Sequence, residues 1–185
     1  WAPRGPPEDR TAMTHAARHR LAATALAGAL ALGAWGLAAC SPVLDGGGLL
    51  QTAQVGRATL SYPAGLELHE EPAQERYLRA SATLESPDRR LAILVREYGG
   101  LTLEDLRQAA EGSTDPNLGL ALERTTVGGR DALRLEGRRG GDHVAFCYVD
   151  GGEGTVVVVG TECDQATWEA NEAAIEAVLS HVEVR

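Results

Sequence analysis

Apolar and polar residues alternate through most of the chain after residue 54. A period of two is typical of a strand with one buried face, and it predicts strands at 55–62, 76–84 and 91–98. Two hairpins are predicted to follow, 118–137 with its turn at Gly128-Gly129, and 143–161 with its turn at 150–154. The second arm of the later hairpin contains the valines 156–159. A strand that is apolar on both faces is normally central and covered on both sides.

Two other segments have the features of helices. Thr102, followed by Asp105 and closed by Gly112, predicts a short helix with a capping-box start. The apolar residues near the end of the chain recur at close to helical spacing: Trp168, Ile175, Val178, Leu179 and Val182. Glutamates occupy the other side, so 164–180 is predicted to be an amphipathic helix that lies on the sheet. The order of elements indicates an α+β fold, an antiparallel β-sheet with helices packed on it.

Three short motifs resemble a known family. They are Tyr62-Pro63-Ala64-Gly65, Val127-Gly128-Gly129-Arg130-Asp131-Ala132 and Ala177-Val178-Leu179-Ser180-His181-Val182. Together they are similar to the PsbP/Mog1-like domain of many envelope lipoproteins, over nearly all of 55–185, although Leu66 stands where the family usually has Trp or Phe. The family includes photosystem accessory proteins, a nuclear-transport cofactor and many proteins of unknown role. The resemblance therefore implies a fold and leaves the function open.

The beginning of the chain has the features of an export signal. Residues 21–39 are uncharged and mostly apolar, and they follow the basic segment 18–20. The motif Leu37-Ala38-Ala39-Cys40 resembles the lipobox of bacterial lipoproteins, in which the cysteine is lipidated. The resemblance implies that residues 1–39 hold upstream sequence and a signal peptide starting at Met13, and that Cys40 is the lipid attachment site.

The same segment has one alternative interpretation. Residues 21–39 are nearly as long as the ~20 residues that span a bilayer. Alanine and glycine dominate them, however, so their insertion as a permanent span is only weakly driven. In both interpretations the rest of the chain is exported and tethered to a membrane. Ser41 stands where the lipoprotein family places Asp for inner-membrane retention, which implies the outer membrane if the cell is diderm.

A flexible tether and one domain are predicted to follow the lipidated cysteine. The tether is predicted over 40–54, because it contains Pro42 and the triplet Gly46-Gly47-Gly48. Residues 55–185 are enough for one α+β domain with its own core.

The charge of the exported part limits its partners. From Ser41 onward there are 13 arginines, no lysine and 24 acidic residues, which gives a net charge of about −11 with neutral histidines. Nucleic acid is a poor partner for such a surface, because phosphate binding needs clustered cations. The predicted partners are the membrane, through the lipid anchor, and an envelope protein or small ligand.

Two cysteines remain after Cys40. Cys147 and Cys163 form an even pair in an oxidising compartment, which favours a disulfide. The expected hairpin register opposes it, because Cys147 would face Val158 and leave Cys163 on the order of 16 Å farther along the strand. Both outcomes stay open at this point.

Few residues point to catalysis or to a metal. Asp142-His143 is a candidate to orient Ser61 or Ser113, and His69-Glu70-Glu71 is a candidate metal loop, but ordinary solvated positions explain both better. Arginine pairs at 89/90 and 138/139, with Arg130 and Arg134, are candidates for a binding rim, although charges at strand tips also keep sheets apart. The chain is thus predicted to have no catalytic residue, no metal and no cofactor.

A non-catalytic binding module is the favoured function. Four aromatic residues are predicted to line an apolar ligand groove between sheet and helix: Tyr77, Tyr98, Tyr148 and Trp168. One alternative is a structural factor that assembles a membrane complex. The other, less favoured, is a hydrolase that uses Asp142, His143 and a serine.

Overall fold

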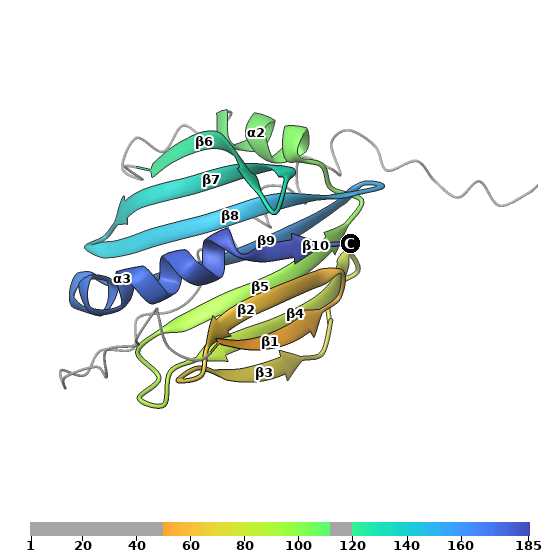
Figure 1. Ribbon diagram of the computed structural model, residues 1–185. Coiled ribbons are helices and arrows are strands. Elements are labelled where there is room, and N and C mark those ends of the chain that lie inside the picture. Colours follow the sequence, from red (N-terminus) through yellow and green to blue (C-terminus); the bar gives the residue numbers. More distant parts are fainter. Residues whose placement is uncertain (1–49, 112–119) are drawn as a thin grey trace, which may run out of the picture.

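Two antiparallel sheets and two helices make up the computed structural model, which describes residues 50–111 and 120–185 (Figure 1). The larger sheet has seven strands in the order β3-β4-β5-β9-β8-β7-β6. Its strands are β3 Glu67–Glu71, β4 Leu78–Glu85, β5 Ala92–Gly99, β6 Leu120–Val127, β7 Arg130–Arg139, β8 Asp142–Gly152 and β9 Thr155–Asp164. The smaller sheet has the order β1-β2-β10, with β1 Leu50–Val55, β2 Ala58–Pro63 and β10 Val182–Val184. The antiparallel α+β fold predicted from the sequence is confirmed at this level.

The valines of β9 have cores on both sides, as their sequence predicts. Val157 and Val159 belong to a cluster with Trp168 and Ile175 of α3, Gln165–Ser180. Val156 and Val158 belong to a second cluster on the opposite face, which the partly buried Leu103 of α2, Leu103–Glu111, packs against. In Figure 1, α3 and the three-stranded sheet lie side by side in front of the large sheet.

Side-chain caps fix the starts of both helices. Asp164 accepts a hydrogen bond from the backbone N–H of Thr167 at 2.9 Å. At α2, the N–H of Thr102 donates to the Asp105 carboxylate at 3.0 Å, and the N–H of Asp105 donates to the Thr102 hydroxyl at 3.2 Å. These bonds satisfy backbone donors that a helix leaves free at its first turn, and they confirm the predicted capping box.

Three strands were not predicted. Leu50–Val55 is β1, so the segment expected to be tether up to Gln54 is in part a strand of the small sheet. Glu67–Glu71 is the edge strand β3 and not a loop; its polar residues are exposed on both faces, so no alternation marks it. The third, β10, has only three residues. No helix among residues 50–111 and 120–185 is long and apolar enough to cross a membrane.

The turn between β1 and β2 fastens the small sheet to the large one. Glu97 of β5 is 4% exposed, and its carboxylate accepts a hydrogen bond from the backbone N–H of Arg57 at 2.7 Å. Gly56 has φ +57°, and a Cβ there would lie 2.0 Å from that carboxylate. Only glycine therefore fits at this turn without displacing the buried charge.

A tight contact in the sheet gives the first testable prediction. Gly160 lies directly opposite Phe146, and a Cβ at residue 160 would come within 2.2 Å of the ring. We expect Gly160→Ala to lower the free energy of unfolding by about 1–3 kcal/mol, measured by urea denaturation, because overpacking a dense core forces side chains to move. In a Phe146→Leu background, Gly160→Ala should lower the free energy of unfolding by clearly less. An equal cost in both backgrounds would contradict this explanation.

Candidate functional site

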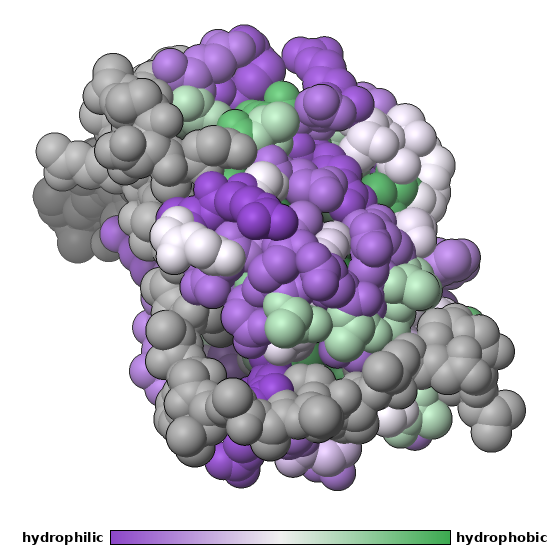
Figure 2. All heavy atoms as spheres, turned by 90° about the vertical axis from the view of Figure 1, so that its left-hand side faces the viewer, coloured by the Kyte–Doolittle hydropathy of each residue, from purple (hydrophilic) through white to green (hydrophobic). Residues whose placement is uncertain are grey.

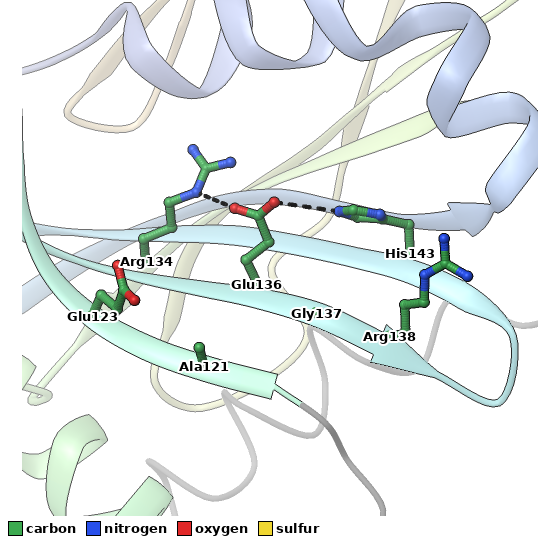
Figure 3. Close-up of a pocket in the computed structure, with 7 residues that line it drawn as sticks. All are labelled: Ala121, Glu123, Arg134, Glu136, Gly137, Arg138 and His143. Atoms are coloured by element: carbon green, nitrogen blue, oxygen red, sulfur yellow. Dashed lines mark hydrogen bonds and ion pairs between the residues drawn. The ribbon is translucent and has the colours of Figure 1, made fainter.

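A hollow lined mainly by ionisable residues lies on the α3 side of the large sheet, over strands β6, β7 and β8 (Figure 3). Its volume is about 380 Å³. The lining residues are Ala121, Glu123, Arg134, Glu136, Gly137, Arg138 and His143. Figure 3 shows Arg134, Glu136 and His143 in a row beside the helix.

Arg134 is held in place by two glutamates. Its Nε donates to Glu136 at 2.7 Å, and one terminal nitrogen donates to Glu176 of α3 at 3.0 Å. These two carboxylates raise the pKa of the Arg134 guanidinium, with Glu176 the larger cause. The bond to Glu176 joins the outer part of the sheet to the helix, so Arg134 forms a fixed and neutralised wall of the hollow.

His143 forms the inner wall. Its ring stacks on Trp168 with centroids 3.6 Å apart and an interplanar angle of 6°. Nε2 lies 3.5 Å from a Glu136 carboxylate oxygen, and neither ring nitrogen has a hydrogen-bond partner within residues 50–111 and 120–185. The stack fixes the imidazole plane and places its nitrogens beside the hollow.

Two exposed charges of the hollow have no ion-pair partner in the described part of the chain. Glu123 lies on β6 opposite Arg134, and Arg138 lies near the end of β7 opposite His143. Arg138 is four residues beyond Arg134, the residue opposite Glu123, so the two charges are separated by about 13 Å along the strand direction. The hollow therefore offers one free anion and one free cation at its two ends.

The predicted aromatic groove is wrong. Tyr98 and Tyr148 are buried in the cluster on the α2 side of the sheet, and Tyr77 packs against that cluster. Trp168, a residue of α3, is buried in the core on the opposite side of the sheet. The four rings therefore belong to two cores and line no common cleft. Burial raises the pKa of Tyr148 far above its usual range, as expected for a core phenol.

The candidate catalytic residues do not form a triad among the described residues. His143 contacts Trp168 and Glu136, whereas Ser61 lies on β2 of the other sheet. Ser113 lies outside the described residues. His69 lies within ion-pair distance of Glu67 and Glu85, at 3.9 and 3.7 Å. No group of three or more metal-ligating side chains occurs within 50–111 and 120–185.

The arginines expected to form a rim have separate roles. Arg89 pairs with Glu85, and Arg139 donates to Glu162 on the other face of the sheet from Arg134. Arg130 Nε donates to the carbonyl of Val184 at 2.8 Å and so holds β10. Of these residues, only Arg134 and Arg138 line the hollow.

The two domain cysteines are free and buried, so the disulfide is not formed. Cys147 lies opposite Val159 and Cys163 opposite His143, because a bulge between Asp150 and Gly152 moves the register by one residue from the expected one. Cys163 is four positions after Val159, which corresponds to about 13 Å along the strand, and a disulfide needs Cα atoms within about 7 Å.

The surface around the hollow is polar. Figure 2 faces the end of the molecule that holds the β7–β8 turn and the start of α3, and hydrophilic residues dominate it, with only scattered apolar patches. Leu50 is the only exposed large apolar side chain of residues 50–111 and 120–185. Recognition here must therefore use charges and backbone groups more than apolar area.

The fold is similar to that of a solved protein. The solution structure of cyanobacterial PsbP (CyanoP) from Synechocystis sp. PCC 6803 matches with a TM-score of 0.53 and 16% identity, over 83% of this chain and 99% of that one. The chain has a PsbP-like fold. The fold implied by the sequence motifs is thus confirmed, and at this identity the likeness shows the fold alone.

Two more distant structures also match. One is from Bacteroides thetaiotaomicron VPI-5482, with a TM-score of 0.43 and 15% identity over 70% of this chain and 45% of that one. The other is a protein of unknown function from Pseudomonas aeruginosa. It matches with a TM-score of 0.40 and 14% identity, over 75% of this chain and 99% of that one. No protein-family model and no curated protein matches the chain.

The buried cysteines give the second prediction. Burial raises the pKa of Cys147 to about 11 and that of Cys163 to about 12, so both thiols are neutral at pH 8 and protected from reagents. In a chain with Cys40→Ser, we expect almost no reaction with a disulfide reagent in the native state. Unfolding without reductant should release both thiols. If they appear only after reduction, the cysteines are paired.

Proposed function

We propose that the chain is a non-catalytic accessory module of a bacterial envelope, anchored by lipid on Cys40, which binds a protein partner at the hollow beside α3. The lipobox-like Leu37-Ala38-Ala39-Cys40 supports the anchor. The PsbP-like fold supports an accessory role, because the family implied by the sequence motifs includes accessory proteins. The hollow supports the place of binding.

The separation of the free charges is the observation that carries this proposal. Glu123 and Arg138 have no partner within the described residues, while Arg134, opposite Glu123, is neutralised by two glutamates. A separation of about 13 Å corresponds to four residues of an extended chain. An extended segment or a surface of a protein can therefore present a cation and an anion at that spacing.

Binding is favoured over hydrolysis by the surroundings of His143. A general base must lie within hydrogen-bond reach of the nucleophile that it activates. The imidazole is instead stacked on Trp168 and close to Glu136, and Cys163, which is opposite it in register, has a raised pKa that keeps its thiol neutral. These contacts favour a rigid wall over a catalytic pair.

The anchor gives the third prediction. In a bacterial host that processes lipoproteins, the unchanged chain should be found in the membrane fraction, and Cys40→Ser should move most of it to the soluble exported fraction. Two or three acyl chains hold a protein far more firmly than one, so the change should be nearly complete. Membrane association that survives the substitution, or an uncleaved start of the chain, would contradict lipid anchoring.

Crosslinking in cells tests the binding role and gives the fourth prediction. A photoreactive amino acid at residue 123 should give one discrete adduct in the native cell. The same group at residue 67, which is exposed on the opposite edge strand, should give none. Arg138→Glu should weaken the adduct from residue 123, because it reverses the free cation of the hollow. Equal adducts from residues 67 and 123 would contradict binding at the hollow.

A further inference from the structure

Strand β6 is an edge of the large sheet as the structure describes it. It forms an unbroken ladder with β7 from Leu120↔Gly137 to Val127↔Arg130, and no described strand pairs with its outer side (Figure 1). It contains no proline and no bulge, and residues 123–126 are exposed on both faces of the strand. Such an edge is a template for another strand.

The opposite edge of the sheet differs. β3 has five residues, and three of them are glutamates. Short length and charge both discourage strand addition. β6 has eight residues with one charge of each sign, Glu123 and Arg124. Of the two edges of the described large sheet, β6 is therefore the better suited to pairing.

The turn after β6 shows which backbone groups point outward. Gly128 and Gly129 have φ of +57° and +77°, as in a two-residue type I′ hairpin turn. Val127 and Arg130 then close the hairpin as a hydrogen-bonded pair. Because inward and outward groups alternate along a strand, the outward N–H and C=O groups belong to Leu120, Leu122, Arg124 and Thr126.

We propose that the partner binds as an extended segment that adds to β6 as an antiparallel strand, with a basic residue opposite Glu123 and an acidic residue two positions later, opposite Ala121. This inference rests on the proposed function and names its partner class. Antiparallel pairing continues the arrangement of the whole sheet. It also uses the main chain, which suits a surface with few apolar groups.

The hollow fits the side chains of such a strand. Glu123 and Ala121 both face it, so every second residue of the added strand lies at its border. The small Ala121 leaves room for an acidic side chain to extend toward Arg138, which lies two strands and two residues away, or about 12 Å between Cα atoms. The order basic, any, acidic therefore matches both free charges.

A second copy of this chain fits the edge less well. If two copies of β6 joined around a two-fold axis into one antiparallel sheet, residues on the same face would lie opposite each other. The two pairings with the longest overlap are therefore centred on residue 123 and on residue 124. The pairing centred on residue 123 places Glu123 opposite Glu123 of the other copy, and the pairing centred on residue 124 places Arg124 opposite Arg124. Like charges directly opposite destabilise a strand pair, which favours a different partner strand.

Two peptides of identical composition test the register. The first is acetylated and amidated Thr-Val-Thr-Arg-Val-Glu-Val, and the second has Arg and Glu exchanged. We expect the full detergent-purified chain to bind the first about fivefold or more tightly, as measured by titration calorimetry. The double variant Glu123→Arg/Arg138→Glu should invert this preference, because both residues are exposed and have no partner in the described part of the chain.

Strand pairing is tested separately from charge. Thr126→Pro removes one outward N–H and should lower the affinity for the first peptide about fivefold or more, while Thr126→Val should leave this affinity unchanged. The peptide should also slow hydrogen exchange of the Leu122 and Arg124 amides. Slowed exchange in the unchanged chain keeps the test valid even if Thr126→Pro fails to fold.

Three results would overturn the inference. They are equal affinity for both peptides, binding with unchanged exchange at Leu122 and Arg124, and no saturation of the first peptide at millimolar concentration. If the adduct from residue 123 in cells depends on Arg138 but not on Thr126, the partner uses the hollow without pairing to β6. The proposed function would then stand while this inference fails.

Discussion

Burial of both faces of strands β8 and β9 is the constraint on which the rest of the structure depends. The valines 156–159 and the residues 147–149 of β8 are fully or almost fully buried, so each face of the sheet needs its own cover. On one face of the large sheet, residues of α3 and of the small sheet form a common core with the sheet residues. On the other face, residues of α2 pack against the second core. Removing either cover would expose continuous apolar surface at the centre of the sheet.

The hollow is a consequence of this arrangement. The helix α3 contacts β8, β9 and β2, and the Glu176–Arg134 pair joins it to the outer strand β7. Strands β6 and β7 extend beyond it, with their polar face exposed. The uncovered region therefore carries charged side chains and is bordered by a strand edge, and His143, which stacks on the buried Trp168, lines it. A binding surface results from a sheet wider than the elements that cover it.

The sequence predicted the parts of the fold with a strong periodic signal. The burial of both faces of the β9 valines, the capping box of α2 and the residue range of α3 are all predicted correctly. The strands β1, β3 and β10 were not, because β1 and β3 are mostly exposed and β10 has only three residues. Such strands form because the sheet supplies their partners, and local pattern does not record this.

The site was harder to predict than the fold. Tyr98 and Trp168 are both aromatic and buried, but alternation alone does not tell which face of the sheet a given helix covers, so they were assigned to one cleft. The bulge in the β8–β9 hairpin also changed the register by one residue. Arg134 was noted among the arginines, while Glu136 and Glu123 gained their roles only from pairing across β6 and β7.

The most direct test of a binding surface at β6 and β7 is hydrogen exchange of the full chain in native membranes and after purification. The outward amides of β6, from Leu122 to Thr126, should exchange more slowly in membranes than in the purified chain, while the amides of β3 should be unchanged. Equal exchange at β6 in both states, or protection confined to β3, would contradict the account.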